Sequence, residues 1–156
     1  EMLRSLVGSE MCIRDRASVD CDTTLYNVLR DLGYKSVKCG CTTSNCGLCT
    51  VWLDDVPVLS CSILALRCEG KKITTLEGIS ESQRKFGELL TEEGGEQCGF
   101  CSPGFIMNVL SLKKTIKNPT DEEIEDYLMG NLCRCTGYAS QMRAIKKYLE
   151  IDDEDK

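Results

Sequence analysis

Short apolar runs with strand-like spacing dominate the first part of the chain. Residues 17–22 alternate weakly between apolar and polar positions, and residues 71–79 predict a further short strand. Residues 50–61 predict two strands around a tight turn at Asp54–Asp55. This pattern indicates a small, strand-rich unit.

One amphipathic helix is expected among these strands, over residues 23–33. Either Thr23 or Asp22 can cap its start, and Gly33 can end it. Its apolar face consists of four residues: Leu25, Val28, Leu29 and Leu32.

The spacing becomes helical in the second part of the chain. Ser102 is the expected N-cap of one helix, with Pro103 at its first helical position, and Thr120 and Glu123 form the capping-box pair of another. Strands followed by helices indicate an α+β chain. The four expected helices span residues 80–94, 102–117, 119–130 and 136–150.

We place a domain boundary near residues 78–82, between a first domain over 17–79 and a second over 80–156. The segment SLVGSEMCIRDR, residues 5–16, resembles a translated sequencing adapter. We therefore expect residues 1–16 to be a non-native leader and assign no function to them, Cys12 included.

Charge and composition exclude several classes of function. The formal net charge is −6 and Lys and Arg form no cluster, so nucleic acid is not an expected partner. No apolar run is long enough to span a membrane, and no secretory signal is visible. We therefore expect a cytoplasmic protein.

Twelve cysteines and no histidine define the possible chemistry. Without an export signal, so many cysteines favour metal or cluster ligation over disulfides. The absence of histidine excludes His-containing zinc sites, Rieske ligation and acid–base catalysis by histidine.

The first cysteine set has the plant-type [2Fe–2S] spacing C-x₄-C-x₂-C, with a fourth cysteine further on. Gly40 and Gly47 allow the tight and left-handed backbone that such a loop needs. A wrapped loop also points backbone N–H groups at the sulfurs. The set consists of Cys41, Cys46, Cys49 and Cys61.

Cys39 is the spare cysteine of this loop, because its use in place of Cys41 would break the spacing. We expect it to be a free thiol. Four cysteines also suit Zn²⁺, although zinc sites usually pair two C-x₂-C knuckles and this set contains one. A disulfide framework is the weaker alternative for a chain that is not secreted.

The second cysteine set combines a C-x₂-C with a C-x-C motif, each at the start of an expected helix. Helix N-termini favour anionic thiolates through the macrodipole and the unpaired N–H groups. The residues alone leave this set open between an iron–sulfur cluster and zinc. It consists of Cys98, Cys101, Cys133 and Cys135.

The two sets in this order, GCTTSNCGLCTV…LSC and then QCGFCSPG…GNLCRCTGY, resemble the small iron–sulfur subunit of the molybdenum hydroxylases. That family includes xanthine dehydrogenase, aldehyde oxidoreductase, carbon monoxide dehydrogenase and nicotinate dehydrogenase. The resemblance runs from about Ala17 to Leu149. It implies an N-terminal β-grasp ferredoxin-like domain and a C-terminal four-helix [2Fe–2S]-binding domain.

The resemblance also implies a role for each set. The first set would bind the [2Fe–2S] cluster nearer the FAD, and the second set would bind the cluster nearer the molybdenum cofactor. Gln97 matches a family glutamine that contacts the pterin of that cofactor on a partner subunit, and Cys135 would lie close to the same pterin.

The chain departs from the family pattern in two places. Family members have a strand and a hairpin turn before the position of Ala17, where this chain has the suspected leader. The first strand is therefore expected to be missing or badly substituted, which would leave a neighbouring strand with an open edge. The segment GYASQM, residues 137–142, replaces an apolar continuation and changes the expected local packing.

The implied function is electron transfer from a molybdenum cofactor on a large subunit, through two [2Fe–2S] clusters, to FAD on another chain or domain. Nothing in the sequence resembles a substrate pocket with an acid–base pair, so we expect no hydroxylation by this chain alone. The alternatives are a free-standing two-cluster ferredoxin-like carrier and a structural zinc protein. The substrate, whether purine, aldehyde, N-heterocycle or carbon monoxide, would be chosen in the large subunit, with a slight preference for a purine or N-heterocycle.

Overall fold

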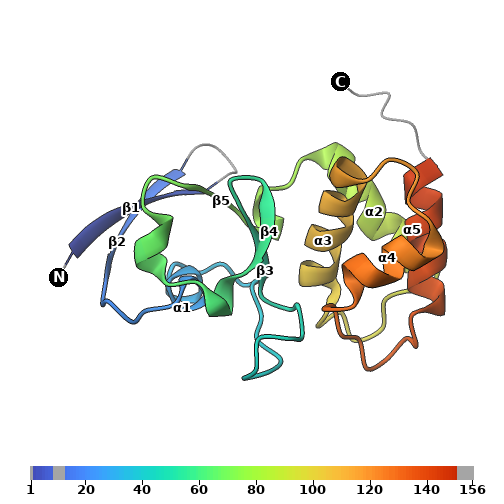
Figure 1. The fold of residues 1–156 in the computed structure, drawn as a ribbon, viewed down its shortest axis with the longest axis horizontal. Helices are drawn as coiled ribbons and strands as arrows, with labels where there is room; N and C mark the ends of the chain where they lie inside the picture. Colours follow the sequence, from blue (N-terminus) through green and yellow to red (C-terminus); the bar gives the residue numbers. More distant parts are fainter. Residues whose placement is uncertain (1, 9–12, 151–156) are drawn as a thin grey trace.

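The computed structural model describes residues 2–8 and 13–150, so Cys12 lies outside the described residues. A half built on a β-sheet and a half built of helices lie side by side along the longest axis (Figure 1). Strands followed by helices were the prediction from the sequence, and this mixed arrangement confirms it.

The sheet has five strands in the order β2-β1-β5-β3-β4. Strands β1 (Met2–Gly8) and β2 (Ile13–Val19) form an antiparallel hairpin. Strand β1 also pairs in parallel with β5 (Lys72–Thr74). Strand β3 (Thr50–Leu53) lies antiparallel to β5 on one side and to β4 (Val56–Leu59) on the other.

Strands β1 and β2 occupy the place where the first strand was expected to be missing. The expectation of a missing strand is wrong, because β1 pairs with β5 and covers the edge that would otherwise be open, while the alternative of a badly substituted strand stays a prediction. The physical reason is that ladder hydrogen bonds come from backbone groups, which every residue except proline supplies in full. A non-native origin of residues 1–16 stays a prediction.

Helix α1 (Leu25–Asp31) begins two residues later and ends two residues earlier than the expected range of 23–33. Its N-cap is Thr24 rather than Thr23 or Asp22, because the Thr24 side chain accepts a hydrogen bond from the backbone N–H of Asn27. The buried face of α1 packs with strand residues in the core of the sheet half. Leu32 lies outside that core and is exposed.

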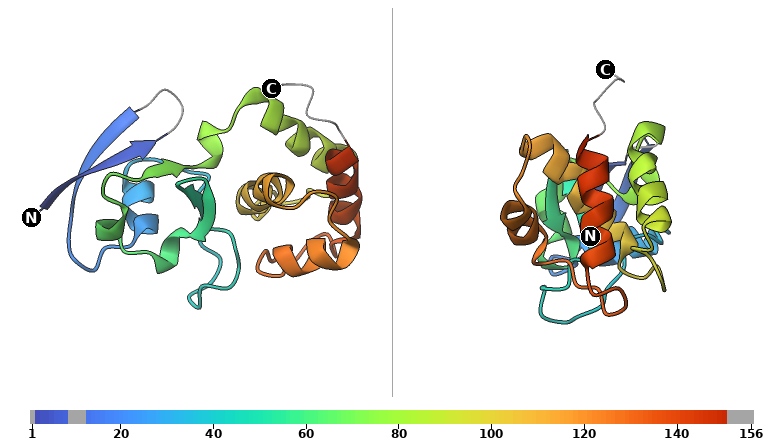
Figure 2. Two further views of the ribbon diagram at one scale, coloured as in Figure 1. Left: turned by 45° about the horizontal axis from the view of Figure 1, so that its top comes forward. Right: turned by 90° about the vertical axis from the view of Figure 1, so that its right-hand side faces the viewer.

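The helical half contains α2 (Glu81–Glu92), α3 (Ser102–Thr115), α4 (Asp121–Leu128) and α5 (Ala139–Glu150). Figure 2 shows α3 nearly end-on between the sheet and α5. Within the described residues, no helix has the length and apolar character that a membrane span requires.

The predicted caps of the helical half hold for α4 and shift for α3. The capping box of Thr120 and Glu123 is present in full at the start of α4. The N-cap of α3 is Cys101 instead of Ser102, so Ser102 and Pro103 occupy the first two helical positions.

The two halves share one packed interface. Trp52 of β3 belongs to the core of the helical half, and its indole N–H donates a hydrogen bond of 3.0 Å to the backbone carbonyl of Met107 on α3. The Nζ atom of Lys114 lies 4.1 Å from the centre of the Trp52 ring. This interface fixes α3 against the sheet and brings the two cysteine sets close together.

Candidate iron–sulfur sites

The first site, defined by Cys41, Cys46, Cys49 and Cys61, forms where the loop before β3 meets the turn after β4. Cys49 Sγ lies 3.3 Å from Cys61 Sγ. The Cys41 and Cys46 side chains are joined by a second sulfur hydrogen bond. The thiols of this site therefore gather as two pairs.

A buried serine holds the closing cysteine of the first site in place. Cys61 lies in a single 3₁₀ turn, Ser60–Ser62, just past β4. The Ser60 hydroxyl donates to the Cys49 carbonyl at 2.8 Å, and the Ser60 backbone N–H donates to the same oxygen at 3.2 Å. Sequence reasoning missed Ser60, because a serine beside a cysteine carries no distinctive signal.

The second site, defined by Cys98, Cys101, Cys133 and Cys135, also gathers as two pairs. Cys98 Sγ lies 3.6 Å from Cys135 Sγ. Cys101 and Cys133 share the other sulfur hydrogen bond of this site. The N-cap of α3 and the loop before α5 supply the two sides.

Pairs of thiols are the arrangement that a two-metal cluster requires. A tetrahedral metal with metal–sulfur bonds of about 2.3 Å holds two thiolates roughly 3.8 Å apart. The Cys49–Cys61 and Cys98–Cys135 separations of 3.3 and 3.6 Å are close to this value. In the part of the chain that the structure describes, no three His, Cys, Asp or Glu side chains form a group suited to a single ion. Two pairs of thiols at each site suit a [2Fe–2S] cluster, in which each of the two irons binds two thiolates.

The electrostatics of the first site favour one thiolate in each pair. Hydrogen bonds from the backbone N–H of Asn45 and from the Cys46 side chain lower the pKa of Cys41 to about 6. Burial raises the pKa of its partner Cys46, and burial raises the pKa of Cys49 to about 12. Burial also acts on Cys61, but its hydrogen bonds with the Ser44 hydroxyl and the Cys49 thiol outweigh burial and lower its pKa.

The second site repeats this asymmetry. The backbone N–H of Phe100 and the Cys135 thiol lower the pKa of Cys98, and the same thiol contact raises the pKa of Cys135. Burial, followed by the neighbouring Cys133, raises the pKa of Cys101 to about 12. Backbone donors aimed at sulfur were the expectation for a wrapped loop, and both sites contain them.

The loops of the two sites touch each other. The backbone N–H of Leu132, next to Cys133, donates 3.0 Å to the carbonyl oxygen of Cys46. A Cβ atom on Gly47, whose φ is +73°, would lie 2.4 Å from the Gly130 carbonyl oxygen and 2.5 Å from Asn131 Nδ2. A glycine at position 47 is therefore required by the approach of the other loop as well as by its own left-handed backbone.

A second glycine on α3 completes this contact. A Cβ atom on Gly104 would lie 2.2 Å from the Gly47 carbonyl oxygen. Gly40, the other glycine predicted for the first loop, has no left-handed backbone, but a Cβ there would lie 2.9 Å from Leu48 Cδ2. Gly104 went unrecognised in the sequence, because its contact joins residues distant along the chain.

The remaining candidates lie beside the sites. Cys39 is exposed, and its thiol donates 3.0 Å to the Cys41 carbonyl oxygen, apart from the sulfur pairs. Gln97 is exposed in the loop directly before Cys98, and its contact with a pterin stays a prediction.

An apolar cavity of about 690 Å³ lies between α3, α4 and α5, and the titratable residues among those that line it are Glu125 and Tyr138.

Comparison with known proteins finds iron–sulfur relatives of this chain. The family model described as [2Fe-2S] binding domain matches residues 75–146. The nicotinate dehydrogenase small FeS subunit of Eubacterium barkeri is 41% identical over 129 residues, covering 81% of this chain and 82% of that subunit. Xanthine dehydrogenase 1 of Arabidopsis thaliana is 40% identical over 146 residues, covering 83% of this chain, which spans only 11% of that protein.

A solved structure supports the same comparison. Quinoline 2-oxidoreductase from Pseudomonas putida 86 superposes with a TM-score of 0.83 at 31% identity. The superposition covers 92% of this chain and 90% of the matched chain.

Proposed function

This chain belongs to the family of small iron–sulfur subunits of the molybdenum hydroxylases, and on that premise we propose that it relays electrons between cofactors held by partner subunits. The first domain, residues 17–79, is then a β-grasp ferredoxin-like domain, whose sheet is extended by β1 and the first residues of β2. The second domain, residues 80–156, is a four-helix [2Fe–2S]-binding domain. The strand order β2-β1-β5-β3-β4, with α1 in the core of the sheet half, supports the first assignment.

In this proposal each cysteine set holds one [2Fe–2S] cluster. A cluster of this kind, when bound, accepts and releases an electron at a potential tuned by its protein surroundings. The chain supplies thiolates in pairs, backbone N–H groups directed at sulfur, and burial. The first site holds its cluster with Cys41, Cys46, Cys49 and Cys61, and the second site with Cys98, Cys101, Cys133 and Cys135.

The contact between the two loops is the observation that carries the relay. The hydrogen bond from Leu132 N–H to the Cys46 carbonyl links a residue next to one second-site cysteine directly to a first-site cysteine. A chain that merely stored two metals for structure would not need its sites joined in this way. The direct contact brings the sites into the proximity that electron transfer requires.

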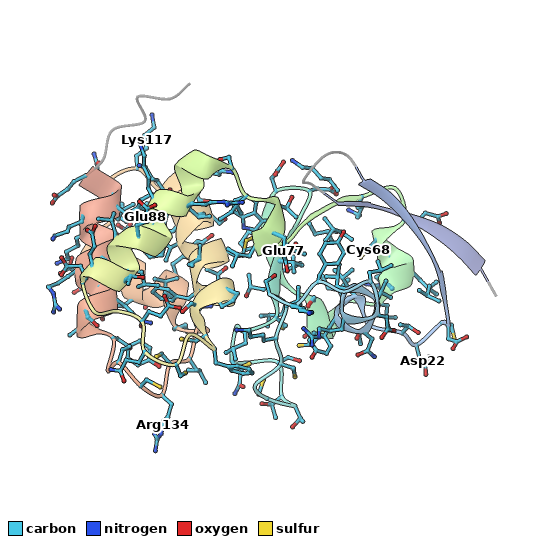
Figure 3. All side chains as sticks on the ribbon, turned by 180° about the vertical axis from the view of Figure 1, so that it is seen from behind. Asp22, Cys68, Glu77, Glu88, Lys117 and Arg134 are labelled. Atoms are coloured by element: carbon cyan, nitrogen blue, oxygen red, sulfur yellow. The ribbon has the colours of Figure 1, made fainter. Side chains whose placement is uncertain are left out.

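The second site faces outward, where a partner is needed. Cys98 and Cys135 are exposed, and four exposed apolar side chains occur in the loops and the helix end that carry the cysteines of this site: Phe100, Met129, Leu132 and Tyr138. Figure 3 shows Arg134, between two of the cysteines, pointing away from the body of the molecule. Exposed apolar side chains beside a site are typical of a protein–protein contact.

We assign this face to a large subunit that holds the molybdenum cofactor, with Gln97 and Cys135 next to the pterin. The first site then passes electrons to FAD on a further subunit or domain. In this proposal substrate hydroxylation belongs to the large subunit, and this chain is the non-catalytic member. The exposed apolar side chains favour a fixed partner over a free-standing carrier.

Anaerobic reconstitution of the full chain tests the proposal. We expect about four iron and about four sulfide per chain, and about two of each in Cys61→Ser and in Cys98→Ser, because each variant loses one cluster. Co-expression with the neighbouring reading frames should give a stable complex that contains molybdenum and FAD. A colourless chain that holds zinc and no iron would contradict the proposal, and a fully loaded chain that never binds a large subunit would support the free carrier.

A further inference from the structure

A single lysine connects the loops of the two sites. The backbone N–H of Lys38 donates 3.3 Å to the Leu48 carbonyl, which anchors Lys38 to the loop of the first site. Its side chain crosses to the second site, where Nζ donates 3.3 Å to the Gly99 carbonyl. Gly99 lies between Cys98 and Cys101, so the ammonium group is placed within the loop that carries two second-site cysteines.

The ring of Phe100 forms a second contact for this ammonium group. Lys38 Nζ lies 5.1 Å from the centre of the Phe100 ring, within the range of a cation–π interaction. The contact with Gly99 is partly buried, so water screens the charge less than on an open surface. Among the described residues, no carboxylate within 4.0 Å of Lys38 neutralises it.

Given the proposed function, on which this inference rests, we propose that Lys38 is a positioning residue that holds the 98–101 loop and whose charge favours the reduced form of the second site. Reduction adds one electron, and therefore one negative charge, to a site already rich in thiolate. A fixed cation nearby stabilises that added charge by Coulomb attraction. Lys38 thereby raises the potential of the second site and helps to draw an electron onto this chain from a partner.

The effect should be larger at the second site than at the first. The Lys38 backbone is tied to the loop of the first site, but its charge is carried by Nζ at the Gly99 carbonyl. A purely mechanical role would change the stability of the loop and leave the potential unaltered. The two roles therefore separate in a measurement that records both quantities.

The chain contains a matched control for this lysine. Lys113 Nζ makes the same two kinds of contact, a hydrogen bond of 3.2 Å to the Tyr148 carbonyl and a position 4.6 Å from the centre of the Tyr148 ring. Lys113 lies near the far end of α3, roughly 18 Å along the helix axis from Cys101 at the helical rise per residue. Its replacement removes a positive charge and a ring contact away from both sites.

The test is an EPR-monitored redox titration of the fully reconstituted chain, with thermal unfolding recorded in parallel. Lys38→Gln removes the charge and keeps an N–H donor, Lys38→Met removes both, and Lys38→Arg keeps the charge. We expect both neutral variants to lower the equilibrium constant for reduction of the second site about tenfold, which is about 59 mV for a one-electron couple. Lys38→Arg and Lys113→Met should leave that constant within about twofold of the unmodified chain.

The outcomes separate the inference from the proposed function. An unmodified chain without iron would contradict both. A fully loaded chain whose second-site potential is unchanged in Lys38→Gln, or whose first site shifts as much as the second, would overturn the inference alone. If Lys38→Met loads iron poorly, Lys38→Gln still tests the inference. A lower unfolding temperature without a change of potential would show that Lys38 only stabilises the loop and would overturn its effect on the potential.

Discussion

The first site is enclosed by its own chain, whereas the second site is open on one side. Cys46 and Cys49 are 6% and 2% exposed, and the Ser60–Ser62 turn closes the first site from within the same half. Cys98 and Cys135 of the second site are exposed. This chain thus covers Cys46 and Cys49 of the first site, whereas Cys98 and Cys135 of the second site are open to solvent.

The difference teaches that the two sites depend on different parts of the chain. The first site comes mostly from one continuous loop, whose cysteine spacing is short. The second site brings together the start of α3 and the loop before α5, which lie far apart in sequence. The shared element is the contact around Gly47, where the two loops meet.

Gly47→Ala should damage both sites together and cause the largest effect. The new methyl group would meet Gly130 and Asn131, and the backbone would also be held at a φ of +73° that alanine disfavours. We expect a loss of roughly 3 to 5 kcal/mol in the free energy of unfolding, together with iron lost from both sites. Urea unfolding and iron analysis measure these two quantities.

Gly70→Ala is the matched control for this substitution. Gly70 has a nearly identical φ of +72°, but nothing lies within 4 Å of the position a Cβ atom would take. It should cost only about 1 to 2 kcal/mol and leave the iron content unchanged. Equal losses in the two variants would show that backbone conformation, and not the meeting of the loops, makes Gly47 necessary.

The local features of the fold could be predicted from the sequence. The strand turn at Asp54–Asp55 is confirmed by positive φ angles at both residues. The start of α5 was placed at 136 instead of 139, because positive φ angles at Gly137 and Tyr138 delay the helix and sequence spacing does not reveal them. The N-cap of α1 shifted by one residue for a different reason, because neighbouring polar residues can each serve as the cap and Thr24 does so here.

Contacts between distant segments could not be predicted. The cysteine spacing indicated which thiols gather, but Gly104 looks like an ordinary residue in the first turn of a helix. The reason why position 104 must be glycine appears only in the folded chain, where Gly47 lies against it and leaves no room for a Cβ atom. Lys38 likewise carries no sequence signal for its contact with Gly99, which is 61 residues away.

The two sites should lose iron at different rates, because their cysteines differ in exposure. With a ferrous chelator added to the reconstituted chain, we expect about half of the iron to leave in a first, faster phase, because Cys98 and Cys135 are open to solvent. Cys98→Ser should lack that phase, and binding of the large subunit should suppress it. Stopped-flow absorbance measures both phases, and faster loss from the first site would contradict the comparison.

Two buried polar atoms, one in each half, lack hydrogen-bond partners among the described residues: Thr74 Oγ1 and Gln141 Oε1. Gln141 belongs to the segment that departs from the apolar family pattern, and its Nε2 makes one long bond of 3.4 Å to the Gly95 carbonyl. Because an unpaired buried acceptor is costly, Gln141→Leu should stabilise the chain by about 1 kcal/mol. Thr74→Val should also stabilise the chain, through the sheet half. Thermal unfolding compares the two variants with the unmodified chain, and destabilisation by both would contradict the cost assigned to these unpaired atoms.

The smallest expected effect lies at the junction of the two halves, where Figure 3 shows Glu77. Its carboxylate accepts hydrogen bonds of 3.0 Å from the Ser36 N–H and 2.5 Å from the Ser36 hydroxyl. Burial would raise its pKa, but the hydrogen bonds from Ser36 and Thr75 outweigh burial, so the pKa lies below its ordinary value of 4.5.

A lowered pKa in the folded state means that the ionised Glu77 stabilises the fold, and this contribution is complete above about pH 4.5. It disappears as the pH falls through the lower folded pKa, because the unfolded chain then binds the proton more readily. The difference in free energy of unfolding between the unmodified chain and Glu77→Gln should therefore be constant near pH 7 and shrink below pH 4.5. Urea unfolding from pH 7 to pH 3 measures it, with Glu88→Gln on the exposed face of α2 as the control. A difference that stays constant to pH 3 would show that Glu77 acts through packing alone.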